Sequence, residues 1–237
     1  EQRIYTSPKN FNGELWMSLS ILQVERREPQ IFTFLKTAIL ALKKAFFSKK
    51  AYDIIVLEYG IDRPKEMEFL LRINKPHIGV FTAIDAVHSE QFGNPAEIAR
   101  EEVKMVKNTR EMVFLNLDDP YSQQLVWTLG VDELSYQTLG SNSKANLTFS
   151  DEKLHLDYKS EHLVLTDIAV HLKKQSLNFQ TNLLGKPNYG YLTVALVIAQ
   201  VLVLKFGGKE LDMEALLAEP LIFQLQPWRC SIFAGKE

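Results

Sequence analysis

The sequence predicts an α/β fold: a mostly parallel sheet flanked by helices, with a small antiparallel β appendage. Between residues 52 and 129, short β-branched apolar runs alternate with segments of helical periodicity. This alternation is typical of parallel strands joined by crossover helices, so the sheet is expected to be covered on both faces. From about Leu134 to Leu184 the pattern changes to short alternating strands separated by turn residues, which predicts the antiparallel appendage.

The first part of the chain predicts three strands and three helices. The β-branched or apolar runs are residues 52–58, 77–82 and 112–117. The helical patterns that follow them are residues 63–74, 94–108 and 119–129. Pro64 suits the first turn of its helix, and Asn94 followed by Pro95 predicts an N-cap and a first helical position.

The rest of the chain predicts short strands followed by two helices. The strands are residues 147–149, 153–158, 162–166 and 176–183, and Ser150 with Asp151 is expected to form a turn between the first two. A helix is predicted over residues 188–206, ended by Gly207 and Gly208, and a short one over 211–217. Residues 1–222 are expected to form the domain, and residues 223–237 a linker that leaves it.

Composition and charge exclude several classes of protein. The chain has 237 residues, 46% hydrophobic and 24% charged, with a formal net charge of -2. This composition is typical of globular proteins and excludes a disordered chain. There is no basic excess to neutralise phosphates, so no nucleic-acid partner is expected. The single cysteine, Cys230, excludes an internal disulfide or a cysteine-cluster zinc site, and a cytoplasmic location is predicted.

Two apolar stretches raise the question of a membrane. Residues 192–204 are too few to span a bilayer and are predicted to form a buried core helix. Residues 31–47 form an amphipathic pattern with Lys36, Lys43 and Lys44. Such a helix either lies on a membrane surface or packs on a core with its lysines in water, and the second is the commoner arrangement. No stable membrane insertion is predicted.

Polar residues follow the predicted strands at their carboxyl ends, where open α/β sheets bind ligands. They are Glu58, His88 and the pair Asn116 and Asp118. Hard oxygen ligands with one imidazole suit Mg²⁺ or Mn²⁺. The alternatives are a carboxylate at a helix N-terminus for Glu58 and a loop histidine bonded to backbone for His88. The sequence contains no GxxxxGK[ST] or GxGxxG phosphate loop and no GxSxG elbow.

Six segments cover nearly the whole chain: Thr6–Trp16, Val56–Met67, Thr82–Gly93, Phe114–Pro120, Gly185–Ala195 and Gln226–Ile232. In this order they resemble the Mur ligases, the ATP-dependent amide-forming enzymes of peptidoglycan synthesis. Each match is weak alone, but six in order are specific. The LEYG and NFN stretches look most like the members that add D-Ala-D-Ala to a UDP-muramoyl tripeptide.

The resemblance implies roles for individual residues. Glu58 matches a carboxylate that binds Mg²⁺, and His88 matches a histidine near a second metal ion. The remaining matches are nucleotide positions at Asn116, Asp118, Asn188 and Arg229, and acceptor-side positions at Asn10 and Asn12.

The family has a lysine, often carbamylated, fourteen positions after the histidine, and Glu102 stands there in this chain. A carbamylated lysine is a carboxylate on a long arm, so Glu102 is predicted to face the metal site. The alternative is that Glu101 and Glu102 form a solvated helix face, with Lys104 as a surface neighbour.

The implied reaction uses ATP and Mg²⁺ to join D-Ala-D-Ala to a UDP-MurNAc-peptide through an acyl phosphate. The alternatives are a related amide ligase of the folylpolyglutamate or cyanophycin type, or a catalytically inactive Mur-like interaction module. Departures from the family pattern at Trp16, Ala83, Tyr191 and Trp228 affect the fine geometry expected for the nucleotide, and substitutions such as Tyr191 and Trp228 keep the last alternative open. Because the chain starts at Glu1 without the family's phosphate loop, it is expected to be the middle of a longer ligase that binds ATP weakly on its own. The oligomeric state is not predicted.

Overall fold

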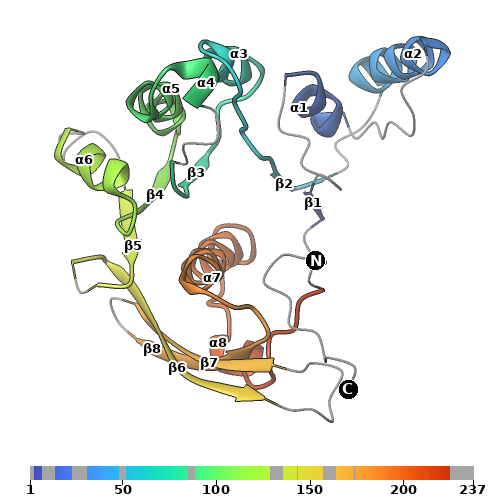
Figure 1. Ribbon diagram of the computed structural model, residues 1–237. Helices are drawn as coiled ribbons and strands as arrows, with labels where there is room; N and C mark the ends of the chain where they lie inside the picture. Colours follow the sequence, from blue (N-terminus) through green and yellow to red (C-terminus); the bar gives the residue numbers. More distant parts are fainter. Residues whose placement is uncertain are drawn as a thin grey trace, which may run out of the picture. The chain divides into compact units, whose positions relative to one another are not determined.

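The computed structural model shows two compact units (Figure 1). The first consists of residues 1–77 and 84–110, and the second of residues 78–83 and 111–237. The structure describes residues 3–6, 14–22, 31–47, 52–84, 89–128, 136–142, 144–156, 164–172 and 175–224.

Within its described residues, the first unit contains a two-stranded parallel sheet and five helices. Strand β1 (Ile4–Thr6) pairs with β2 (Ile54–Val56), with Ile4 opposite Ile54. The helices are α1 (Glu14–Ile21), α2 (Ile31–Phe47), α3 (Glu66–Ile73), α4 (Ser89–Phe92) and α5 (Pro95–Asn108). Apolar residues at helical spacing on α3 and α5 are buried, among them Leu70 and Val106, and these two helices pack together.

The starts of α3 and α5 show how local signals set helix boundaries. Asn94 caps α5 as predicted: its side-chain oxygen accepts a hydrogen bond from the Glu97 N–H at 3.1 Å. Helix α3 begins at Glu66, so the prediction that Pro64 lies in its first turn is wrong. The Glu66 carboxylate instead accepts the N–H groups of Asp62 and Arg63, at 2.6 and 2.9 Å, and holds the preceding residues in a turn.

The described part of the second unit contains a mixed sheet of six strands in the order β3-β4-β5-β6-β7-β8. The pairs from β3 to β6 are parallel, and the pairs from β6 to β8 are antiparallel. The antiparallel strands therefore continue the parallel sheet. The strands are β3 (Ile78–Phe81), β4 (Met112–Asn116), β5 (Tyr136–Gly140), β6 (Leu147–Leu156), β7 (Val164–His171) and β8 (Ser176–Thr181).

Strand β6 corrects the prediction of a turn at Ser150 and Asp151. It runs through both residues, and its register against β7 shifts between Asp151 and Lys153. A bulge of this kind absorbs an extra residue without ending the strand. Further along, the Asp167 carboxylate on β7 accepts hydrogen bonds from His155 on β6 and Gln180 on β8, at 2.6 and 2.8 Å. The His155 hydrogen bond, followed by that of Gln180, lowers the pKa of Asp167.

The core of the second unit lies between the sheet and α7 (Lys186–Gly207), which packs over one face of the strands (Figure 1). Two shorter helices complete the unit, α6 (Pro120–Thr128) and α8 (Met213–Leu216). The Gly208 N–H bonds to the Leu204 carbonyl in a left-handed cap, which confirms the predicted helix end. Phe114 on β4 and Ile168 on β7 are among the most buried side chains.

Helix α7 is the one helix within the described ranges that is long and apolar enough to cross a membrane. Core helices of water-soluble proteins pass the same test. The prediction of a buried core helix over residues 192–204 is confirmed only in part: Leu192 and Val194 are buried in the core of the second unit, whereas Leu204 is 43% exposed.

Candidate functional site

Asn116 joins the carboxyl ends of two neighbouring strands. It is the last residue of β4, and its side-chain amide donates to the Thr82 carbonyl, just after β3, at 2.8 Å. Its side-chain oxygen accepts from the Asp118 N–H at 3.0 Å. Asn116 therefore fixes both the gap between the strands and the turn that follows β4.

Asp118 connects that turn to the next strand end. Its carboxylate accepts the Ser141 N–H at 2.9 Å and the Ser141 hydroxyl at 3.1 Å. The neighbouring Gly140 leaves room for this contact, because a Cβ atom there would lie 3.1 Å from the Asp118 Oδ1 atom. Both predicted residues at the end of β4 thus shape the loops through their hydrogen bonds.

A pocket of about 400 Å³ opens between these loops and the start of α7. Gly190 gives it depth, since a Cβ atom there would lie 3.0 Å from Leu139 and 3.1 Å from Phe149. The lining combines amide, carboxylate and hydroxyl groups with apolar and aromatic walls. It consists of Asn116, Leu117, Asp118, Gln123, Leu139, Ser141, Asn142, Phe149, Lys186, Pro187, Gly190 and Tyr191.

Asn188, the third predicted nucleotide residue within the described part of the chain, lies in the first turn of α7. Its side-chain amide donates to the Leu184 carbonyl at 2.7 Å, and the residue does not belong to the pocket lining. Most of the pocket lining was missed by sequence reasoning, including Gly190 and Phe149. A glycine inside a long apolar helix was a usable signal for the first, because such a glycine often marks a close approach.

The predicted metal residues that the structure describes lie in the first unit. Glu58 is exposed, two residues after β2. The next residue, Tyr59, anchors this loop: its hydroxyl donates to the Asn74 carbonyl at 3.0 Å and accepts from the Asn74 side-chain amide at 2.9 Å. Burial raises the pKa of Tyr59, which keeps the phenol protonated as a donor.

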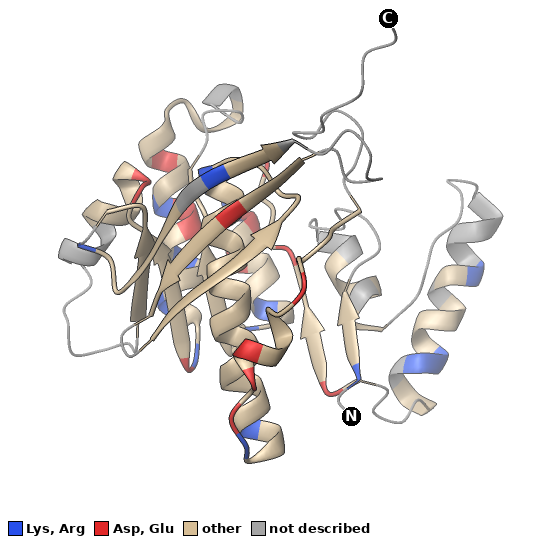
Figure 2. Cartoon of the chain, turned by 90° about the horizontal axis from the view of Figure 1, so that it is seen from below, with Lys and Arg blue, Asp and Glu red and all other residues tan. Residues whose placement is uncertain are grey.

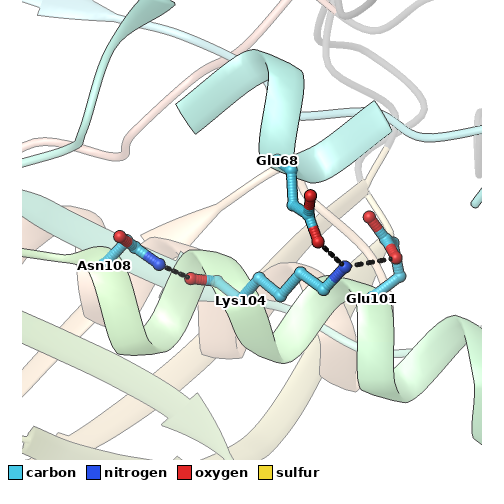
Figure 3. Close-up of polar contacts among 4 residues, drawn as sticks. All are labelled: Glu68, Glu101, Lys104 and Asn108. Atoms are coloured by element: carbon cyan, nitrogen blue, oxygen red, sulfur yellow. Dashed lines mark hydrogen bonds and ion pairs between the residues drawn. The ribbon is translucent and has the colours of Figure 1, made fainter. Parts of the chain in front are cut away.

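Of the adjacent acids on α5, Glu101 rather than Glu102 is buried, with 8% of its side chain exposed. The Lys104 ammonium donates to Glu101 at 2.8 Å and to Glu68 on α3 at 2.7 Å (Figure 3). Partial burial works to lower the pKa of Lys104, but its hydrogen bonds to Glu101 and Glu68 outweigh it and raise that pKa. Glu101 is therefore part of an internal ion pair, not of a solvated face.

Glu102 is half-buried, and its orientation toward a metal site stays a prediction. Glu58 and Glu102 carry the hard carboxylate oxygens that Mg²⁺ prefers. Across the ranges described by the structure, no three acidic, histidine or cysteine side chains come together to bind a metal ion. His88, Arg229, Asn10 and Asn12 lie outside those ranges.

A larger hollow of about 650 Å³ lies elsewhere in the first unit. Arg72, Lys75, Lys104 and Arg110 contribute to it, near the last turns of α3 and α5. Cations at helix C-termini complement the negative end of the helix dipole, which accounts for this basic cluster without a ligand. The smaller pocket of the second unit is therefore the better candidate site.

Comparisons with known proteins identify the family to which the chain belongs. The family model described as the Mur ligase middle domain matches residues 14–199, more than half of the chain. None of the curated proteins matches. Among solved structures, MurF from Acinetobacter baumannii is similar with a TM-score of 0.61 and 14% identity, over 89% of this chain and 38% of that one.

The MurF ligase from Thermotoga maritima, in complex with ADP, is similar with a TM-score of 0.62 and 14% identity, over 100% of this chain and 45% of that one. A UDP-N-acetylmuramoyl-L-alanyl-D-glutamate–2,6-diaminopimelate ligase is similar with a TM-score of 0.55 and 15% identity, over 92% of this chain and 45% of that one. The chain thus spans less than half the length of these enzymes, and the likeness shows a shared fold. With the family match, it shows that the chain belongs to the Mur ligase family, whose middle domain it contains.

Proposed function

We propose that this chain is part of an ATP-dependent amide ligase of peptidoglycan precursor synthesis that joins D-Ala-D-Ala to a UDP-MurNAc-peptide in the cytoplasm. The observation that carries the proposal is the pocket at the carboxyl ends of β4 and β5, lined by Asn116 and Asp118. Open α/β sheets bind nucleotides at this edge. The family match supports the same assignment, and the Thermotoga maritima relative is a complex with ADP.

The chemistry of the pocket suits the base and ribose of a nucleotide. Its volume of about 400 Å³ lies within the usual range of small-molecule sites. Tyr191, Phe149 and Leu139 offer aromatic and apolar surface for a base, and the Ser141 and Asn142 side chains offer hydrogen-bonding groups for a ribose. Lys186, at the first position of α7, adds positive charge at the rim.

The proposed reaction has two steps. A carboxylate oxygen of the UDP-MurNAc-peptide attacks the γ-phosphorus of ATP, and ADP leaves, which gives an acyl phosphate. The amine of D-Ala-D-Ala then attacks the acyl carbon, loses a proton and expels inorganic phosphate from the tetrahedral intermediate, which leaves an amide bond. Positioning and charge stabilisation carry most of the catalysis in such phosphoryl transfers.

Other residues enter the proposal through the resemblance. Glu58, His88 and Glu102 are proposed to hold Mg²⁺, which when bound would neutralise phosphate charge. Asn188 and Arg229 are proposed on the nucleotide side, and Asn10 and Asn12 on the acceptor side.

Tyr191 tests the pocket, because it lines the pocket yet is 37% exposed, so that its loss spares the core. The Tyr191→Ala change is expected to weaken ADP binding about ten-fold, the usual effect of removing one aromatic surface from a stacked base. Saturation-transfer NMR with ADP measures weak binding to the 237-residue chain. Phe206→Ala is the matched control on the same helix, with 42% exposure, and should leave binding unchanged. If both variants bound ADP with equal affinity, the nucleotide would not bind in this pocket.

Substrate-dependent phosphate release separates the proposed activity from its alternatives. The native protein that carries this chain is expected to release phosphate from ATP only when both UDP-MurNAc-tripeptide and D-Ala-D-Ala are present. Release with a folate and glutamate instead would indicate a folylpolyglutamate type of ligase. ADP binding without release for any acceptor would indicate an inactive interaction module.

A further inference from the structure

Helix α2 exposes a row of apolar side chains among those that the structure describes. Ile39, Leu42 and Phe46 are spaced three and four residues apart, so they lie on one face, and they are 58%, 60% and 76% exposed. Phe47, next to them in sequence, is 82% exposed. An amphipathic helix of a globular domain normally turns such a face toward the core. Among the α2 side chains that the structure describes, apolar residues as well as lysines are therefore exposed.

The charge of α2 is opposite in sign to that of the whole chain. The helix carries Lys36, Lys43 and Lys44 and no acidic residue, while the chain has a formal net charge of -2. Figure 2 shows this helix with blue segments and no red ones. Lys36 and Lys43 are exposed and lie seven residues apart, at the border of the apolar face. Long lysine stems at such a border can extend along apolar surface and keep their ammonium groups in a polar layer.

We propose that α2 binds flat on the surface of a lipid bilayer that carries anionic headgroups. Leu42, Ile39 and Phe46 would enter the boundary between headgroups and acyl chains, and Lys36 and Lys43 would meet the lipid phosphates. The helix has 17 residues, fewer than the roughly 20 that span a bilayer, which suits a surface position. This inference is independent of the proposed ligase activity, and such binding differs from insertion across the membrane.

Charge favours an anionic bilayer, rather than a second copy of the chain, as the binding partner of this apolar face. Pairing two α2 helices through their apolar faces would bring their border lysines near one another, with no acidic side chain on the helix to neutralise them. An anionic lipid surface supplies the missing negative charge. Each lysine near such a surface contributes about five-fold in affinity, so the two exposed lysines, Lys36 and Lys43, matter even for a short apolar face.

Vesicle flotation of the 237-residue chain tests the proposal. The chain is expected to float with phosphatidylcholine vesicles containing about one third phosphatidylglycerol, to remain free with phosphatidylcholine alone, and to be released by high salt. The double change Lys36→Ala and Lys43→Ala should weaken binding roughly 30-fold. The matched control, Lys75→Ala with Lys107→Ala, removes two exposed lysines elsewhere in the first unit and should leave binding unchanged.

The apolar half is tested with Phe46→Ser, compared with Phe69→Ser at a 44% exposed position on α3. The first is expected to lose flotation and the second to retain it, with unchanged thermal unfolding in both. The proposal would be overturned if the chain bound neutral vesicles as well as anionic ones, or if it did not bind anionic vesicles. So would reversible self-association in sedimentation experiments that Phe46→Ser abolishes, because the face would then bind a second copy.

Discussion

Replacing Lys104 with methionine is expected to lower the free energy of unfolding of the chain by about 3 kcal/mol. Removing one partner of a buried ion pair typically costs about 3–5 kcal/mol, because the remaining charge stays buried without compensation. Glu101 has 8% of its side chain exposed, and its second oxygen, Oε1, has no hydrogen-bond partner among the residues that the structure describes. Lys104 is 32% exposed, so water screens part of the effect and the lower end of the range applies. Urea unfolding followed by circular dichroism measures the change.

Two further variants separate the buried half of this contact from the exposed half. Glu68→Gln breaks only the outer ion pair, whose carboxylate is half exposed, and should cost much less than Lys104→Met. Combining Glu101→Gln with Lys104→Met removes both charges and should restore most of the stability, since no carboxylate is then buried. A Lys104→Met variant no less stable than Glu68→Gln would show that Glu101 is not the costly partner.

The same residues show which parts of a helix can be read from sequence. The start of α5 was predictable, because Asn94 and Pro95 act on backbone groups only a few residues away. The choice between Glu101 and Glu102 as the inward-facing acid was not, because it depends on Glu68, which stands on a different helix and 36 residues from Lys104. Adjacent acids on a helix differ by about 100° in direction, so only the position of the neighbouring helix decides between them.

The strands, too, differ in how well the sequence predicts them. Strands with β-branched runs were predicted close to their bounds, and β4 differs by one residue from the expected range of 112–117. Their partners were not predicted: β2 pairs with β1, a strand of three residues that is too short to form a recognisable pattern. Strand β5 was missed as well, although it joins the parallel strands to the antiparallel ones. Strand pairing is set by contacts distant in sequence, which single-sequence patterns do not contain.

At the candidate site, the rule that places ligands at strand carboxyl ends identified Asn116 and Asp118, and both line the pocket. The rule applies to each strand separately, so it identified the polar residues at the strand ends and missed the apolar and aromatic residues that line the rest of the pocket. Phe149 and Gly190 belong to β6 and α7, and only the packing of that helix on the sheet brings them there. The hydrogen bonds of Asp118 to Ser141 also show a structural role that sequence could not separate from a ligand contact.

Replacing Gly190 with valine is expected to lower the free energy of unfolding by about 2–3 kcal/mol and to abolish ADP binding. A Cβ atom at Gly190 would lie 3.0 Å from a methyl carbon of Leu139 and 3.1 Å from the ring of Phe149, both buried. Added methyl groups would force those side chains from their positions, and overpacking of this kind costs about 1–3 kcal/mol. The displaced groups line the pocket, so its volume falls as the core is strained.

Gly207→Val is the control on the same helix. Its Cβ atom would lie 3.9 Å from Val203, an ordinary contact, so stability and ADP binding should change little. Gly190→Ala should fall between the two, because alanine favours a helix by about 1 kcal/mol over glycine while its methyl group meets the same close contacts. Thermal unfolding and saturation-transfer NMR below the unfolding temperature measure both effects. A Gly190→Val chain as stable as Gly207→Val, with ADP still bound, would mean that Leu139 and Phe149 yield without cost and that the nucleotide does not use the space above Gly190.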